Sequence, residues 1–157
     1  MTPLIILGVI VAVVLFVLWR KGDETDVKMA DIPTIFEVLK TTGKDASWAQ
    51  FCFGIQDNSV NLQFSIENGR IGFDWFLLCP ANVRDKEKFR QLAERLGHNL
   101  TEHKYENGSE NLRTEDGDLV ALCEACFRDL YQWPVNAKIG MVWDGFSWPL
   151  AEEKSSK

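Results

Sequence analysis

The cysteines and histidines are the residues whose chemistry first suggests a metal or redox site. Cys123 and Cys126 form a Cys-x-x-Cys motif, and His98 and His103 could complete a zinc site with it. Two histidines before the cysteine pair do not match the common zinc spacings, and a redox motif normally starts a helix rather than lying inside one. The pattern favours two buried core thiols and two surface histidines, with a metal-binding or redox protein as the alternative.

Other catalytic signatures are missing from the sequence. It contains no G-x-S-x-G nucleophile motif, no glycine-rich phosphate loop and no H-E-x-x-H motif. The net charge of −6 lacks the basic footprint that binds phosphate backbones. We therefore expect a protein that is not an enzyme, binds no cofactor and no nucleic acid, and has no evident small-molecule substrate.

The N-terminus, residues 1–21, carries an uncharged apolar run followed by two cations. As a helix, this run would span about 25 Å, close to the hydrocarbon thickness of about 30 Å. Pro3 suits a first helical turn, Trp19 suits a headgroup interface, and Arg20 and Lys21 could extend toward water. No basic n-region or small-residue cleavage site is present, so the sequence predicts a retained single-pass membrane anchor.

Positive charge after this run predicts the topology of the anchor. Arg20, Lys21 and Lys28 all follow the apolar run, whereas no basic side chain precedes it. The positive-inside rule then places the N-terminus outside and the remaining domain in the cytoplasm, at the inner membrane of a bacterium. The inverted topology, with a periplasm-facing domain that inhibits an envelope enzyme, is a second alternative.

The rest of the chain divides into three parts by composition. Residues 22–31 are polar and lack a hydrophobic period, which predicts a linker. Residues 32–150 predict one small α+β domain, which begins with a short helix between Pro33 and Gly43. Residues 151–157 predict a disordered tail.

A β-hairpin over residues 60–78 is the clearest local signal. Asn68-Gly69 separates two alternating runs, and this pair favours a type I′ turn. The register then pairs Phe64 with Phe73 and places the large apolar side chains of both strands on one face. The sequence therefore predicts this hairpin at the centre of an antiparallel sheet, packed by two or three amphipathic helices.

The remaining elements are predicted from periodicity. Alternating residues indicate a strand over 48–56, and apolar residues at helical spacing indicate helices over 83–97 and 116–134. Residues 100–115 are polar and predict an exposed hairpin or loop. Residues 137–150 predict an edge strand followed by an aromatic-rich turn.

This order of elements resembles the α+β fold of type III secretion chaperones and related small bacterial regulators. The resemblance covers residues 32–133 and rests chiefly on "VNLQFSIENGRIGFDWFLL" followed by "KFRQLAERLG". It implies a non-catalytic module that works through protein contacts.

The second face of the predicted sheet is the candidate partner-binding surface. Cys52, Phe76 and Leu78 project to this face, which is too apolar to stay fully wet, and Asp74 projects to it as a surface residue. Either the C-terminal aromatic residues cover this face, or they anchor a partner there. We therefore predict a membrane-anchored protein-interaction module of the immunity, regulatory or chaperone-like kind. Its candidate binding residues are Cys52, Phe76, Leu78, Trp143, Phe146 and Trp148.

Overall fold

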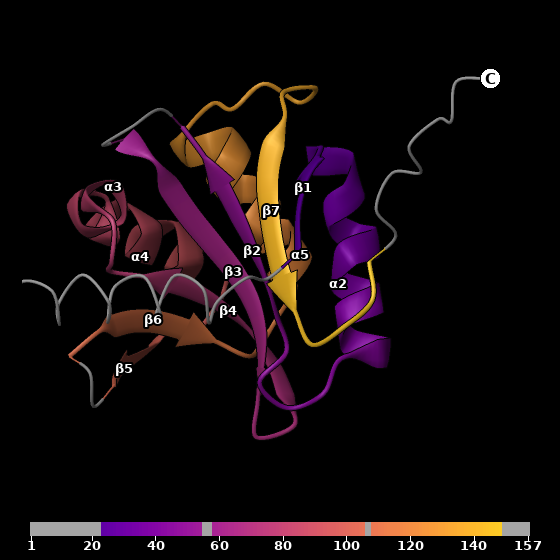
Figure 1. The fold of residues 1–157 in the computed structure, drawn as a ribbon. Coiled ribbons are helices and arrows are strands. Elements are labelled where there is room, and N and C mark those ends of the chain that lie inside the picture. Colours follow the sequence, from indigo (N-terminus) through magenta and orange to yellow (C-terminus); the bar gives the residue numbers. More distant parts are fainter. Residues whose placement is uncertain (1–22, 55–57, 106–107, 149–157) are drawn as a thin grey trace, which may run out of the picture.

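The computed structural model describes residues 23–54, 58–105 and 108–148 as one α+β fold (Figure 1). Seven antiparallel strands form a single sheet in the order β1-β7-β2-β3-β4-β6-β5. The strands are β1 Asp23–Val27, β2 Trp48–Phe53, β3 Val60–Glu67, β4 Arg70–Phe76, β5 Thr101–Lys104, β6 Glu110–Thr114 and β7 Ile139–Asp144. The helices are η1 Met29–Asp31, α2 Ile32–Thr42, α3 Pro80–Arg84, α4 Lys86–Arg95, α5 Leu119–Ala125 and the π-helical η3 Cys126–Leu130.

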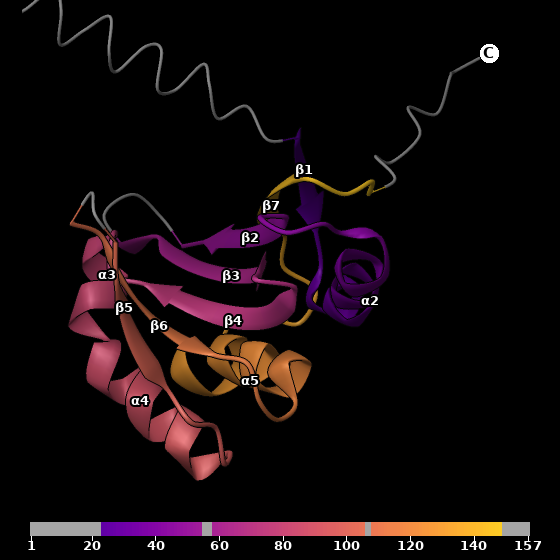
Figure 2. The same cartoon turned by 90° about the horizontal axis from the view of Figure 1, so that it is seen from below.

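The helices α2, α4 and α5 lie on one side of the sheet, as Figure 2 shows. The core lies between these helices and the sheet and is rich in aromatic side chains. Trp75 stacks on Phe89 of α4 with ring centroids 4.4 Å apart, and Phe64 makes an edge contact with Phe36 of α2 at 5.0 Å. One-sided burial of this kind is what alternating antiparallel strands allow.

The predicted central hairpin is confirmed. Strands β3 and β4 pair with Phe64 opposite Phe73 and Glu67 opposite Arg70, and β3 is the middle strand of the sheet. Asn68 and Gly69 have φ values of 52° and 72°, as a type I′ turn requires. The α2 helix and the antiparallel α+β class are confirmed as well.

Asn82 of α3 joins this short helix to the sheet where β3 and β4 separate. Its Oδ1 accepts a hydrogen bond from the Asn61 backbone N–H at 3.1 Å, and its Nδ2 donates to the Asn61 carbonyl at 2.8 Å. The Cys79 thiol donates to the same Oδ1, and the Trp75 indole donates to the Asn82 carbonyl at 3.0 Å. The amide therefore takes the place of a neighbouring strand and satisfies buried backbone groups.

The predicted linker over residues 22–31 is wrong, because β1 and η1 occupy most of it. β1 adds to the sheet beside β7, and Val27 and Met29 are buried. The predicted edge strand near the C-terminus is also misplaced, since β7 lies between β1 and β2. Long-range strand pairing decides both positions, and local propensity does not report it.

The second half of the chain differs from the prediction in three places. The helix predicted over 83–97 starts earlier and breaks at Asp85, whose carboxylate accepts a hydrogen bond from the Tyr131 hydroxyl at 3.2 Å. The hairpin predicted over 100–115 forms, but four of the five residues of β6 are buried rather than exposed. The helix predicted over 116–134 ends with the π-helical turn η3.

The structure contradicts the expected membrane helix in the fold class. In the ranges that the structure describes, no helix is long and apolar enough to cross a membrane. The longest, α2, has 11 residues, whereas a span needs about 20. We therefore withdraw the predictions of a single-pass anchor and of an inner-membrane location. The residues assigned to the anchor, Pro3, Trp19, Arg20 and Lys21, lie outside the described ranges, as does the tail over 151–157.

Candidate functional site

The side of the sheet opposite the helices, which we call the open face, is the candidate site. It is turned toward the viewer in Figure 1, and no described helix lies on it (Figure 2). Alternate strand residues form it, because successive side chains of a strand point to opposite sides. From β1 to β5, its main residues are Glu24, Asp26, Gly140, Val142, Asp144, Trp48, Gln50, Cys52, Asn61, Gln63, Ser65, Glu67, Gly72, Asp74, Phe76, Asn111, Arg113, Thr101 and His103.

A buried ion pair between Asp74 and Arg113 lies at the β3–β4–β6 part of the open face. The two side chains are 0% and 1% exposed. The Arg113 Nη1 donates to both carboxylate oxygens, at 3.0 and 2.9 Å. The Ser65 hydroxyl and the Asn111 amide donate to the same carboxylate at 2.5 and 2.8 Å. One carboxylate therefore links three adjacent strands.

Burial and charge act on the Asp74 carboxyl in opposite directions. Burial is the larger effect and raises the pKa of Asp74 above its ordinary value, while the Arg113 guanidinium and the Ser65 hydroxyl offset part of this shift. Removing Arg113 would leave the buried Asp74 carboxylate without a cation, at a cost of about 3–5 kcal/mol, whereas Arg113 without Asp74 would keep its ion pair with Glu115. The pair is therefore a strong constraint on strand position.

Gly72 makes room for the guanidinium on the open face. A Cβ at this position would lie 2.5 Å from the Arg113 Cζ, well inside contact distance. Beyond Gly72, the Arg113 Nη2 donates to the Arg70 carbonyl at 3.1 Å. The arginine from β6 therefore crosses β4 in the space that a side chain would otherwise fill.

Charged groups around the ion pair are themselves paired. The Arg113 Nε donates to Glu115 at 3.0 Å, and the Arg70 Nε lies 2.9 Å from the other oxygen of that carboxylate. The Tyr105 hydroxyl donates to Glu67 at 3.2 Å, and burial together with this carboxylate raises the pKa of Tyr105 to about 12. Each of these charged groups in the described network therefore already has an ion-pair or hydrogen-bond partner.

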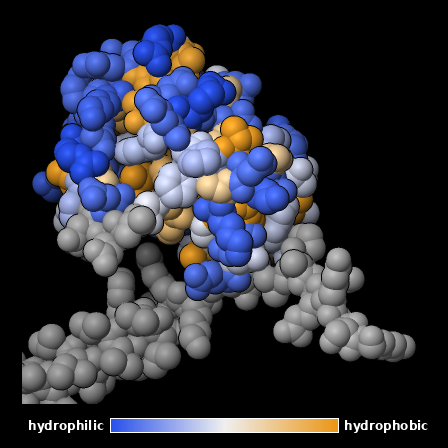
Figure 3. Space-filling model, turned by 90° about the horizontal axis from the view of Figure 1, so that it is seen from above, coloured by the Kyte–Doolittle hydropathy of each residue, from blue (hydrophilic) through white to orange (hydrophobic). Residues whose placement is uncertain are grey.

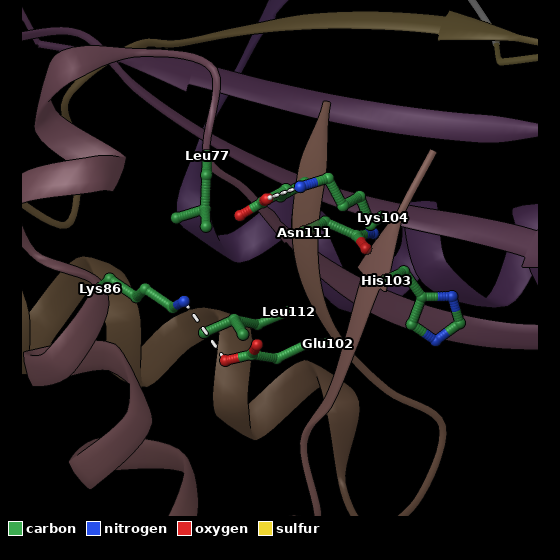
Figure 4. Close-up of a pocket in the computed structure, with 8 residues that line it drawn as sticks. Leu77, Lys86, Glu102, His103, Lys104, Asn111 and Leu112 are labelled. Carbon is green, nitrogen blue, oxygen red and sulfur yellow. Dashed lines mark ion pairs between the residues drawn. The ribbon is translucent and has the colours of Figure 1, made fainter. Parts of the chain in front are cut away.

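A small pocket lies on the helix side of β5 and β6 (Figure 4). Its volume is about 240 Å³, and two ion pairs cross it, Lys86–Glu102 at 3.2 Å and Lys104–Glu110 at 3.1 Å. Figure 4 shows His103 pointing away from the side where Leu77, Lys86 and Glu102 gather. The polar groups neutralise one another and do not converge on a reacting atom. The pocket is lined by Leu77, Lys86, Glu102, His103, Lys104, Glu110, Asn111 and Leu112.

The predicted partner-binding residues are only partly brought together. Cys52 and Phe76 lie on the open face, and each is half-buried. Leu78 follows the end of β4 and is 64% exposed. Figure 3 views the molecule from above the orientation of Figure 1 and shows that the apolar residues on that upper surface form small separate groups among hydrophilic ones.

The C-terminal aromatic residues do not cover the open face as we expected. Trp143 points to the helix side and is 2% exposed, because it lies opposite the buried Ala49 in the β2–β7 pairing. Phe146 and Trp148 are half-buried and pack against the core. Trp143 is therefore a core residue, and it has no surface to offer a partner.

The Cys-x-x-Cys motif lies in the core. Cys123 and Cys126 are fully buried, and burial raises the pKa of both thiols far above the ordinary value. In the described part of the chain, no group of three or more histidine, cysteine, aspartate or glutamate side chains could hold a metal ion. The described geometry thus offers no support for the metal or redox alternative.

The two histidines lie apart from the cysteines. His103 is half-buried on β5, where its Nε2 lies 3.0 Å from the Thr101 hydroxyl. His98 was expected at the surface, but it is 5% exposed and its Nδ1 lies 2.9 Å from the Asp116 carbonyl. Gly117 permits this, since a Cβ there would lie 2.8 Å from the imidazole ring.

Sequence reasoning missed the ion pair. It placed Asp74 on the second face of the sheet, where the strand pairing also puts it, but it assigned Asp74 to the surface. Arg113 lies in a polar segment with no hydrophobic period. The only local signal was Gly72, a glycine inside an otherwise regular strand, which often marks a close approach of other atoms.

Comparison with known proteins finds no match. No family model matches the chain, and neither a curated protein nor a solved structure matches it.

We predict that Gly72→Ala destabilises the protein while Gly140→Ala does not. Both glycines lie in strands on the open face, but a Cβ at Gly140 would meet only ordinary contacts, the nearest at 3.4 Å. Displacing Arg113 should lower the free energy of unfolding of Gly72→Ala by about 2–3 kcal/mol in urea denaturation. Equal stability of the two variants would contradict the proposed role of Gly72.

We predict that Cys52, Cys123 and Cys126 of the folded protein react slowly with iodoacetamide. Burial and the neighbouring Cys79 raise the pKa of Cys52 to about 11, so at neutral pH its reactive thiolate fraction falls about one hundredfold. Its alkylation rate should keep rising toward pH 11, and Cys123 and Cys126 should stay unmodified until the chain unfolds. Mass spectrometry of each cysteine peptide checks this, with the urea-unfolded chain as control. A rate for Cys52 that levels off near pH 9, or fast labelling of Cys123, would contradict it.

Proposed function

We propose that this chain is a non-catalytic protein-interaction module, of the immunity, regulatory or chaperone-like kind, and that the open face is its binding surface. The observation that carries the proposal is a sheet face on which no described helix lies and which carries partly exposed apolar side chains. Trp48, Cys52, Phe76 and Val142 are each half-buried there, where an ordinary solvated face would carry polar residues. Tryptophan and other aromatic residues dominate the energetics of protein interfaces.

The polar part of the open face supports the same proposal. The network around Asp74 and Arg113 holds β3, β4 and β6 in one arrangement before any partner arrives. Rigid surfaces bind with less loss of conformational entropy than mobile ones. Among the described residues, the charged groups of this network are paired with one another, which suits recognition better than catalysis.

We predict that a photo-crosslinking amino acid on the open face captures one discrete protein in the natural host. Gln50 and Gln63 are suitable positions, because both lie half-buried on this face. Glu37 on α2 and Glu94 on α4 are exposed control positions on the helix side. The readout is the size and identity of the adducts after illumination. Adducts from the helix positions alone, or none from Gln50 and Gln63, would overturn the proposal.

A further inference from the structure

The β1–β7 end of the open face differs in charge from the ion-pair network. We define the acidic patch as Glu24, Asp26 and Asp144 with the neighbouring Val142 and Gly140. From this patch we infer that the partner of the open face binds through a basic segment that also carries apolar side chains. The inference rests on the proposed function and specifies the chemistry of the partner.

The carboxylates of the acidic patch are available for a partner. Glu24, Asp26 and Asp144 are all exposed. Asp26 is paired with Lys138, whose Nζ lies 2.8 Å from its carboxylate. Within the described ranges, Glu24 and Asp144 form no ion pair. A partner cation can therefore approach both of them without first breaking an ion pair to a described residue.

Apolar surface adjoins these carboxylates. Trp48 lies opposite Asp144 across β2 and β7, and Cys52 lies opposite Gly140. Val142, Trp48 and Cys52 are half-buried, so each presents part of its side chain to solvent. Gly140 has no side chain and leaves the backbone of β7 accessible between Cys52 and Asp26. Apolar side chains of a partner can contact this strip while its cations reach the carboxylates.

Charge favours a basic partner over a second copy of this chain as the occupant of the open face. The whole chain carries a net charge of −6. A symmetric dimer through the acidic patch would bring the same carboxylates of two copies together, which is repulsive. A basic segment is instead attracted from a distance, since complementary charge raises association rates and makes them salt-dependent.

The test combines charge reversal with the crosslinking residue at Gln50. The patch variant is Glu24→Lys with Asp144→Lys, and the matched control is Glu37→Lys with Glu94→Lys. Both pairs remove two exposed carboxylates and add two cations, so they change the net charge equally. We expect the adduct yield of the patch variant to be about tenfold lower than that of the chain with the crosslinker alone, and the yield of the control to stay within about twofold of it. Urea denaturation of both variants verifies that the fold is intact.

A defined probe repeats the measurement with the purified full-length chain. A fluorescent peptide of alternating leucine and lysine should bind the unsubstituted chain. Its affinity should be about tenfold lower for the patch variant, and the affinity for the unsubstituted chain should fall as salt is added. The same peptide with glutamate for lysine should not bind.

The outcomes separate the two proposals. If the adduct still forms and the peptide still binds after the charge of the acidic patch is reversed, the inference of a basic segment is overturned. The open face then remains the proposed binding surface. An adduct that maps to an acidic segment does the same. If the chain with the crosslinker at Gln50 or Gln63 and an unchanged acidic patch forms no adduct, the proposed function and this inference are both overturned.

Discussion

The buried ion pair between Asp74 and Arg113 is the interaction on which the arrangement of the sheet depends. The carboxylate comes from β4, and the guanidinium comes from β6 and also donates to Ser65 of β3. A desolvated pair has little tolerance for displacement, because among the described residues Arg113 is the cation that compensates the Asp74 carboxylate. This explains why β4 carries Gly72 and why the polar β6 is buried beside the central hairpin.

The two parts of the open face follow from this constraint. Around Arg113 the charged groups are paired with one another, and the Asp74 carboxylate and the Arg113 guanidinium are buried. Toward β1 the sheet carries exposed carboxylates beside the half-buried Trp48 and Val142. A rigid support next to an acidic and partly apolar strip is an arrangement suited to recognition of another protein. The charged groups of the described network are engaged with one another.

Local signals in the sequence predicted the elements that local interactions determine. The Asn68-Gly69 turn and the alternation around it determine the central hairpin, and the apolar spacing with Pro33 determines α2. The predicted order from α2 to β7 is also found. Elements that depend on distant partners were missed. β1 is too polar to be recognised as a strand, and it forms because β7 offers it an edge.

The candidate site was less predictable than the fold. The face of Cys52 and Phe76 followed from strand alternation, but the burial of Trp143 depended on the position of β7. Arg113 and Asp74 are 39 residues apart, and nothing in the sequence indicates that they meet. The apolar N-terminal run pointed to a membrane helix through its length, its hydropathy and the flanking Trp19, Arg20 and Lys21. These residues lie outside the described ranges, and no described helix is long and apolar enough to cross a membrane.

A double-mutant cycle on Asp74 and Arg113 tests this account most directly. Asp74→Asn and Arg113→Met should each lower the free energy of unfolding. The arginine variant should lower it by about 3–5 kcal/mol, because it leaves the buried carboxylate without a cation, whereas Arg113 in the Asp74→Asn variant keeps its ion pair with Glu115. The double variant should cost little more than either single one, which gives a coupling energy well above the additivity error of about 0.5 kcal/mol. Losses that simply add would show that the two residues act independently, and would contradict the ion pair as the constraint that holds the sheet.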